Sequence, residues 1–289
     1  MPILYVLILA IVQGLAELLP VSSSAHVVVA EKMLGIDPSS PPATLLLVML
    51  HTGTMFAVIV YFWRPWRDTY FQSTTCFKKF AGCVALATAL TGLIGEAIVK
   101  TMEKTFFRGV PHAEIEDLFS HLELIAPALA LVGILILLAG IIEKRKAASS
   151  LHGANPLNAK EAAIIGAVQG LCLPFRGFSR SGATISAGML LGVRKSRAEM
   201  FSFALAVVLT PVVVVREVMR AVHAGSASGT ATFASAAFPS LLGAAFAFLA
   251  GLIALKWLSR WLDDGRWYLF GIYCLMAAVA VAILHHAGY

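Results

Sequence analysis

Charged side chains are scarce in this sequence, and their scarcity excludes most soluble folds. Only 13% of the 289 residues are Asp, Glu, Lys or Arg, whereas about a quarter of a typical soluble domain is charged. Hydrophobic residues make up 59% of the chain. No stretch is both long and polar enough to form a separate soluble domain. We therefore expect an all-α polytopic membrane protein.

Cysteine is also rare, and its spacing excludes two further classes of protein. Cys76, Cys83, Cys172 and Cys274 are too dispersed for a disulfide framework or a thiolate metal site. The N-terminus lacks the basic region and the small-residue cleavage site of a signal peptide, so we expect Pro2–Leu19 to be retained. The net charge of +6 is explained by basic cytoplasmic loops and does not indicate a nucleic-acid partner.

Long apolar runs predict six transmembrane helices, because each run approaches the roughly 20 residues that cross a bilayer. The predicted spans are Ala43–Trp63, Ala81–Val99, Leu124–Ile142, Met200–Met219, Ser240–Leu258 and Trp267–Leu284. Two pairs of shorter apolar segments remain, 2–19 with 25–34 and 161–173 with 183–193. The arms of the second pair would be about 20 Å long or less as helices, which favours a re-entrant hairpin.

A repeated motif relates the two halves of the chain. Val12-Gln13-Gly14-Leu15 recurs as Val168-Gln169-Gly170-Leu171, an offset of 156 residues, and a serine-rich break follows each copy. The first arm, 2–19, is long enough to span by itself, so its re-entrant interpretation depends on this repeat. We expect one membrane domain, 1–289, with repeats at about 1–143 and 160–289. Polar, broken helices in both halves of a membrane protein mark a binding site.

The repeat also predicts an orientation. Each half contains one hairpin and three spans, and the odd number inverts the second half relative to the first. Loops on one side then carry 14 Lys and Arg residues, against six on the other, so the more basic side is expected to be cytoplasmic. The first hairpin would open outward and the second inward.

The first copy carries side chains that could perform chemistry. Glu17 interrupts an apolar run, where a carboxylate is costly and usually functional, and it lies one helical turn after Gln13. His26 follows the break at Ser22-Ser23-Ser24. Together these groups could activate a nucleophile or position a metal ion, although a purely structural Glu17 stays an alternative. His51, on an apolar face of a span, is interpreted as a hydrogen-bonded core residue.

The second copy predicts an anion site. Ser179-Arg180-Ser181-Gly182 lies where the second hairpin turns and a helix begins. Backbone N–H groups and the helix dipole attract anions there, and the guanidinium of Arg180 suits phosphate oxygens. The alternative is a structural ion pair between Arg180 and Glu17.

Both motifs resemble those of the bacitracin-resistance family of undecaprenyl-diphosphate phosphatases. The resemblance rests on Val-Gln-Gly-Leu-Ala-Glu with Leu-Pro-Val-Ser-Ser-Ser-Ala-His, and on Gly-Phe-Ser-Arg-Ser-Gly-Ala-Thr-Ile-Ser-Ala-Gly. It covers nearly the whole chain. It implies a bacterial inner-membrane enzyme that hydrolyses undecaprenyl diphosphate to undecaprenyl phosphate and inorganic phosphate, and so recycles the lipid carrier for peptidoglycan synthesis.

The family motifs place functional roles on particular residues. The catalytic candidates are Glu17, Ser23, His26 and Arg180, and the substrate-binding candidates are Gln13, Ser22, Gln169, Ser179, Ser181 and Thr184. Two departures stand out. Arg176-Gly177 replaces the usual Pro-Gly, and Gln13 replaces a Glu that many relatives carry.

The expected mechanism places the diphosphate between the two hairpin turns. A divalent cation, Mg²⁺ or Ca²⁺, would bridge Glu17 and phosphate oxygens, and either Ser23 or His26 would be the nucleophile. The rival function is a transporter or lipid flippase in which Glu17 and His26 relay protons or ions. The sequence leaves open whether the protein is a homodimer.

Overall fold

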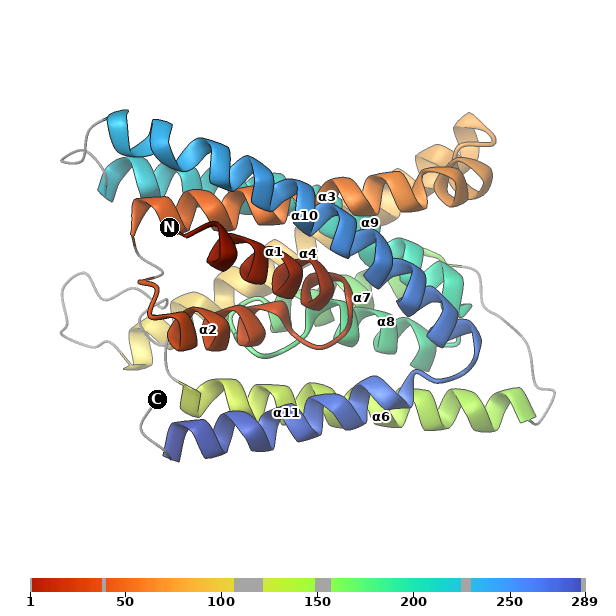
Figure 1. The fold of residues 1–289 in the computed structure, drawn as a ribbon. Helices are drawn as coiled ribbons and strands as arrows, with labels where there is room; N and C mark the ends of the chain where they lie inside the picture. Colours follow the sequence, from red (N-terminus) through yellow and green to blue (C-terminus); the bar gives the residue numbers. More distant parts are fainter. Residues whose placement is uncertain (1, 38–39, 107–121, 149–156, 225–229, 287–289) are drawn as a thin grey trace. The chain divides into compact units, whose positions relative to one another are not determined.

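The computed structural model describes residues 2–37, 40–106, 122–148, 157–224 and 230–286. Within these ranges the chain forms ten α-helices and no strand (Figure 1), which confirms the all-α prediction. The helices are α1 (Ile3–Leu18), α2 (Ser23–Leu34), α3 (Pro41–Tyr70), α4 (Thr74–Phe106), α6 (Leu122–Ala148), α7 (Ala159–Cys172), α8 (Arg180–Leu190), α9 (Lys195–Ala224), α10 (Thr230–Asp263) and α11 (Tyr268–His286).

Five helices in the described residues are long and apolar enough to cross a membrane, judged by length and composition. Their apolar segments are Pro42–Tyr70, Thr74–Met102, Leu124–Arg145, Ala237–Asp263 and Tyr268–His286. These segments match five of the six predicted spans. The remaining one, Met200–Met219, lies within α9, a helix of 30 residues that is not among the five. Membrane crossing by α9 therefore stays a prediction.

The two predicted hairpins form pairs of short helices. α1 and α2 contain 16 and 12 residues, and α7 and α8 contain 14 and 11, all fewer than the roughly 20 that span a bilayer. The members of each pair pack against each other, and Figure 1 shows α2 returning alongside α1. These lengths agree with the predicted hairpins, while their re-entry into the membrane stays a prediction.

Local sequence explains where the hairpin helices begin and end. Asn158 forms a capping box at the start of α7, because its side chain accepts hydrogen bonds from backbone N–H groups while Glu161 accepts from the N–H of Asn158. Pro174 follows the end of α7 and cannot continue a helix. Each turn contains one residue with positive φ, Ser22 at 68° and Gly177 at 94°. A Cβ on Gly177 would lie 2.6 Å from the Ile125 carbonyl, so this turn requires glycine.

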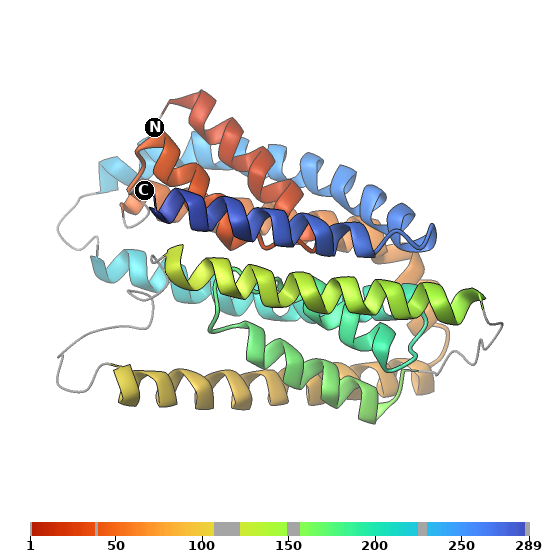
Figure 2. The same cartoon turned by 90° about the horizontal axis from the view of Figure 1, so that it is seen from below.

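The chain divides into two compact units, and each takes segments from both predicted repeats. Unit 1 comprises Met1–Leu19, Ser23–Arg64 and Ala206–Leu258, and unit 2 comprises Pro20–Ser22, Pro65–Leu205 and Ser259–Tyr289. In unit 1, a buried cluster joins α1, α3 and α10 through Val6, Leu9, Ala10, Leu46, Leu50 and Ala247. In unit 2, α11 runs antiparallel beside α6, and α4 packs along α7 (Figures 1 and 2).

Glycine permits close helix contacts in each unit. In unit 1, a Cβ on Gly14 of α1 would lie 2.7 Å from the Ala247 carbonyl of α10. In unit 2, a Cβ on Gly170 of α7 would lie 2.9 Å from the Thr91 carbonyl of α4. Small residues at such crossings are typical of helix packing in membranes. Both helix pairs therefore approach so closely that a larger side chain would separate them.

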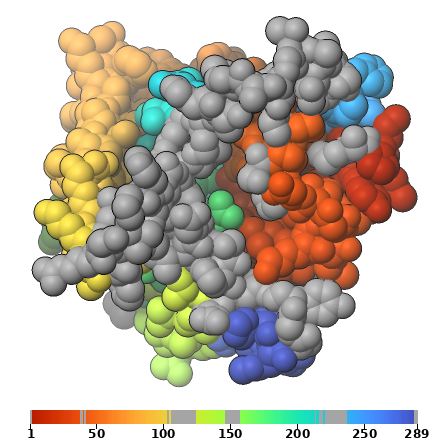
Figure 3. Space-filling view, turned by 90° about the vertical axis from the view of Figure 1, so that its left-hand side faces the viewer, coloured from red at the N-terminus to blue at the C-terminus, as the bar shows by residue number. Residues whose placement is uncertain are grey.

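Apolar side chains remain exposed on the surface of the helices. Ile3 and Leu4 of α1 are exposed, and the N-terminal segment is visible at the surface in Figure 3, in red. Leu131 of α6 and Met276 of α11 expose large apolar side chains in unit 2. Contact with lipid accounts for this exposure in a chain with several apolar spans, since water would make it unfavourable.

Candidate active site

Three polar side chains converge on one oxygen of Glu17 in unit 1. The Ser23 hydroxyl donates a hydrogen bond of 2.5 Å to Oε2, and Nε2 of Gln13 donates to the same atom across 3.2 Å. Nε2 of His51 lies 3.8 Å from it. The first two contacts confirm that Gln13 and Glu17 share a helix face and that the serine break lies beside them.

The backbone of the first hairpin turn brings Ser23 back to Glu17. α1 ends at Leu18, and α2 begins at Ser23 directly after Ser22, whose left-handed conformation costs roughly 1–2 kcal/mol for a residue other than glycine. The distance of 2.5 Å is typical of a hydroxyl that donates to a carboxylate. A hydroxyl nucleophile and its general base have this arrangement in covalent catalysis.

The interpretation of His51 as a core residue was incomplete. Its Nδ1 atom does form the expected hydrogen bond, at 2.9 Å from the carbonyl of Leu47 one turn earlier in α3. Its Nε2 atom, however, is directed toward Glu17, and the His51 side chain is 27% exposed. The sequence signal for this position was a histidine within an otherwise apolar helix. The sequence does not show how α3 is rotated about its axis, so it could not show that His51 faces Glu17 of α1.

His26 lies on α2, one turn after Ser23, and is half-buried. It is therefore on the same short helix as Ser23, which the sequence had placed in the break before that helix. The histidine that the structure places 3.8 Å from Glu17 is His51, from a helix outside both motifs. The catalytic role of His26 stays a prediction.

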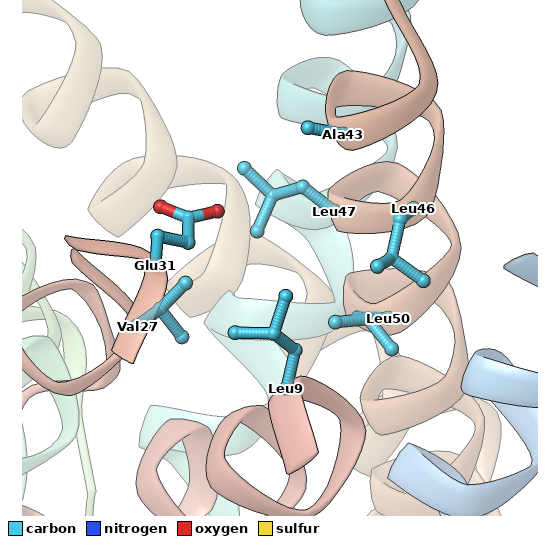
Figure 4. A pocket seen from close by; sticks show the side chains of 7 residues that line it. All are labelled: Leu9, Val27, Glu31, Ala43, Leu46, Leu47 and Leu50. Carbon is cyan, nitrogen blue, oxygen red and sulfur yellow. The ribbon is translucent and has the colours of Figure 1, made fainter. Parts of the chain in front are cut away.

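An apolar crevice lies beside this polar cluster, between α1, α2 and α3 of unit 1 (Figure 4). It is too narrow to admit a water molecule. Its lining residues are Leu9, Val27, Glu31, Ala43, Leu46, Leu47 and Leu50. Val27 lies one turn after Ser23, and Leu47 one turn before His51, so the crevice continues from the polar cluster along the same helices. Figure 4 shows Leu9, Val27 and Leu47 pointing toward one another, with the Glu31 carboxylate at the margin.

The predicted anion site in unit 2 is the N-terminus of α8. Ser179 is the N-cap residue, and its hydroxyl accepts a hydrogen bond of 3.2 Å from the N–H of Gly182. The hydroxyl of Ser181 lies 3.4 Å from that of Ser179, and both serines are buried. Arg180, half-buried, is the first residue of the helix. The prediction that a helix begins at this motif is confirmed.

Thr184 supports the start of α8 from inside the protein. Its fully buried hydroxyl lies 2.8 Å from the carbonyl of Arg180 and 2.6 Å from the hydroxyl of Ser202 in α9. Because a carbonyl only accepts, Thr184 donates to Arg180 and accepts from Ser202. The structure thus gives Thr184 a supporting role, and its direct contact with substrate stays a prediction. Sequence reasoning missed Ser202, since a serine in an apolar helix carries no motif.

The repeated glutamine is used differently in the two halves. Gln13 donates to Glu17, whereas Gln169 is fully buried and donates to the Thr91 hydroxyl of α4 across 3.1 Å. The residue 156 positions after Glu17 is Leu173, so the second copy has no carboxylate to receive the amide. Gln169 therefore joins α7 to α4 in unit 2, and its predicted contact with substrate stays a prediction.

The donor set around Glu17 fits a hard divalent cation that keeps most of its own water. The described residues contain no cluster of three or more His, Cys, Asp or Glu side chains able to enclose a metal ion. Mg²⁺ commonly binds through one or two carboxylates together with substrate phosphates. A single carboxylate, supported by Gln13 and Ser23, agrees with that kind of site better than with an all-protein cage.

Comparison with known proteins finds a family model and several relatives that match nearly the whole chain. The family model described as bacitracin resistance protein BacA matches residues 6–280. The chain is 56% identical over 287 residues to undecaprenyl-diphosphatase 2 of Acinetobacter baylyi, with 98% of each chain covered. It is 34% identical to an undecaprenyl-diphosphatase of Desulfosudis oleivorans over 93% of each chain, and 32% identical to one of Gluconacetobacter diazotrophicus over 99% of this chain and 98% of the relative.

Proposed function

Because the chain belongs to the bacitracin resistance protein BacA family, we propose that it hydrolyses undecaprenyl diphosphate to undecaprenyl phosphate and inorganic phosphate. The protein is then a multi-pass membrane enzyme that returns the lipid carrier to peptidoglycan synthesis, and its activity confers bacitracin resistance. The single observation that carries the mechanism is the hydrogen bond of 2.5 Å from Ser23 to Glu17.

Ser23 is the nucleophile in this proposal, because its proton already has an acceptor. Glu17 takes the hydroxyl proton while Ser23 Oγ bonds to the terminal phosphorus. The bond from that phosphorus to the bridging oxygen breaks, and undecaprenyl phosphate leaves with the bonding electrons. Water then attacks the phosphoserine, releasing inorganic phosphate and restoring the hydroxyl. His26, on the same short helix, is assigned to proton transfer with the leaving group and the water.

The N-terminus of α8 is assigned to binding phosphate. Arg180 offers a planar fork of N–H donors that matches phosphate oxygens, and the helix dipole adds favourable charge. The Ser179 cap and the bonds of Thr184 to Arg180 and Ser202 hold the backbone at this end of the helix. Phosphoryl transfer depends mainly on positioning of the phosphate and on neutralisation of its charge. The N-terminus of α8 can contribute to both.

A divalent cation, Mg²⁺ or Ca²⁺, is the proposed cofactor, and Glu17 would hold it through Oε1, the carboxylate oxygen that does not take the Ser23 proton. When bound, it would neutralise charge that develops on the phosphate oxygens. Gln13 keeps the carboxylate of Glu17 oriented through its hydrogen bond of 3.2 Å.

The apolar crevice of unit 1 is proposed to receive the isoprene unit next to the diphosphate. Its walls are Leu and Val side chains that begin one turn from Ser23 (Figure 4). Because the crevice is too narrow for water, its side chains must move apart when the lipid enters. An apolar wall beside a polar cluster matches a substrate with a charged head and a hydrocarbon chain.

We propose that the two halves of the chain are inverted repeats. In support, the helices of the second half follow the order and approximate lengths of those in the first, α1 to α6 against α7 to α11. The glycine contacts agree as well: Gly14 and Gly170 differ by 156 positions, and so do their partners Thr91 and Ala247. The hairpin of each half thus packs on a long helix of the other half in an equivalent register.

The proposed orientation places the protein in the inner membrane with the mouth of the first hairpin toward the periplasm. It predicts that a cysteine at Asp37, exposed between α2 and α3, is labelled by impermeant thiol reagents in cells with a permeabilised outer membrane. A cysteine at Thr75, exposed in the first turn of α4, should be protected until the inner membrane is broken. The background must lack Cys76, Cys83, Cys172 and Cys274. The opposite labelling pattern would reverse the orientation.

The function is tested by incubating purified protein with a C55 or C15 prenyl diphosphate and Mg²⁺. We expect release of inorganic phosphate and accumulation of the prenyl monophosphate, both prevented by Ser23→Ala. Proton-coupled uptake of lipid into liposomes without phosphate release would instead favour the transporter or flippase alternative and reject the proposal.

A further inference from the structure

His51 belongs to neither motif, yet its ring approaches the oxygen of Glu17 that Ser23 and Gln13 already contact. Nε2 lies 3.8 Å from Oε2, and the two side chains are only 27% and 17% exposed. The residue comes from α3, so its position near α1 and α2 results from packing within unit 1. The proposed mechanism leaves this side chain without a role.

The hydrogen bond to Leu47 fixes which nitrogen faces Glu17. A backbone carbonyl only accepts, so Nδ1 of His51 carries the hydrogen in the bond of 2.9 Å. This bond holds the ring one turn from Leu47 on the same helix and directs Nε2 toward Glu17. In the neutral ring, Nε2 then presents a lone pair rather than a hydrogen.

The lone pair on Nε2 can accept a hydrogen bond from Glu17 only after Glu17 has received a proton. Before attack, Oε2 accepts from Ser23 and Gln13, and 3.8 Å is too long for a direct hydrogen bond to His51. Once Ser23 bonds to phosphorus, its proton lies on Oε2 and Ser23 no longer donates there. Nε2 is then an acceptor about 1 Å beyond the usual hydrogen-bond range, which a small side-chain movement can close.

We propose that His51 is a positioning residue that acts through Glu17, by accepting a hydrogen bond from its carboxyl group after the Ser23 proton has moved there. The proton passes from Ser23 Oγ to Glu17 Oε2, and His51 holds it at that atom until it is needed in the second step. Because the contact strengthens only after proton transfer, it raises kcat and leaves KM nearly unchanged. This inference depends on the proposed function.

Two amide substitutions test the roles of the two ring nitrogens of His51 separately. His51→Asn places a polar atom near Nδ1 and can keep the bond to Leu47, whereas His51→Gln places one near Nε2 and can reach Glu17. We expect His51→Asn to lower kcat on the order of 100-fold, the size associated with a misplaced catalytic group, with KM changed by less than about threefold. His51→Gln should retain at least about a tenth of the wild-type kcat.

Thr52→Val is the matched control. Thr52 is the next residue of α3 and, like His51, bonds to a carbonyl one turn earlier, that of Val48 at 2.8 Å. Loss of this bond should leave kcat and KM for phosphate release from a prenyl diphosphate unchanged. A kcat loss for Thr52→Val equal to that of His51→Asn, or a higher kcat for His51→Asn than for His51→Gln, would make His51 structural and overturn the inference.

Parallel measurement of Glu17→Gln distinguishes failure of the inference from failure of the function. If Glu17→Gln is inactive while both His51 variants keep wild-type kcat, the catalytic assignment of Glu17 stands and the role of His51 is rejected. If folded Glu17→Gln is active, the proposed site itself is wrong. A double variant, His51→Asn with Gln13→Ala, adds a further check. Both side chains act on the same oxygen of Glu17, so the loss of kcat in the double variant should differ from the product of the two single losses.

Discussion

Glu17→Gln is expected to lower phosphate release by a factor of about 10³ or more while the protein stays folded. The amide keeps the size of the side chain and can still accept a hydrogen bond from Ser23, but it cannot take the proton. General-base catalysis contributes about 10²–10⁴-fold, and loss of the carboxylate also removes the charge proposed to hold the cation. Phosphate release by detergent-purified protein measures the effect, with size-exclusion profile and melting temperature as checks on folding.

Gln13→Ala provides the comparison for that result. Gln13 contacts the same oxygen of Glu17, at 3.2 Å, but contributes orientation without charge. Its removal should therefore cost roughly tenfold, the lower end of what misorientation of a catalytic group produces. Equal losses for the two variants would contradict this division of roles, and wild-type turnover by folded Glu17→Gln would remove Glu17 from catalysis.

Arg180 is a second position at which a large effect is expected. Arg180→Ala should lose about 10²–10³-fold in turnover, because it removes the donors proposed to bind the phosphate, and substrate binding should weaken as well. Arg180→Lys keeps the positive charge but loses the paired N–H geometry, so it should retain weak binding and lose most of the turnover. Steady-state rates of phosphate release, measured over a range of substrate concentrations, give kcat and KM and so separate the effect on turnover from the effect on binding.

Thermal stability distinguishes a phosphate clamp from a structural ion pair. A clamp predicts little change in the melting temperature of Arg180→Ala without substrate. If Arg180 instead forms a structural ion pair with Glu17, its removal would leave a buried carboxylate without its partner and lower the free energy of unfolding by about 3–5 kcal/mol. The double variant Arg180→Met with Glu17→Met would then recover the stability. That recovery would reject the clamp. Arg67→Ala serves as the control, because Arg67 is exposed, pairs with its exposed neighbour Asp68 and lies outside the proposed site. Its loss should change neither the turnover nor the melting temperature.

The sequence by itself determined the class of protein and the local parts of the site. Low charge and long apolar runs sufficed for the membrane assignment, because the bilayer sets both the length and the composition of a span. The pairing of Gln13 with Glu17 followed from helical periodicity, which places residues four apart on one face. The start of α8 at Ser179 followed from capping chemistry. All three depend on neighbours within one or two turns.

Only the tertiary structure decided which distant side chains complete these local groups. His51 reaches Glu17, Ser202 reaches Thr184, and Thr91 reaches Gln169, each from another helix. In a chain whose helices are apolar on most faces, periodicity does not show which face packs inward, so the rotation of each helix is hidden from the sequence. That rotation is set by close contacts such as Gly14 on Ala247 and Gly170 on Thr91, because only small residues let the backbones approach.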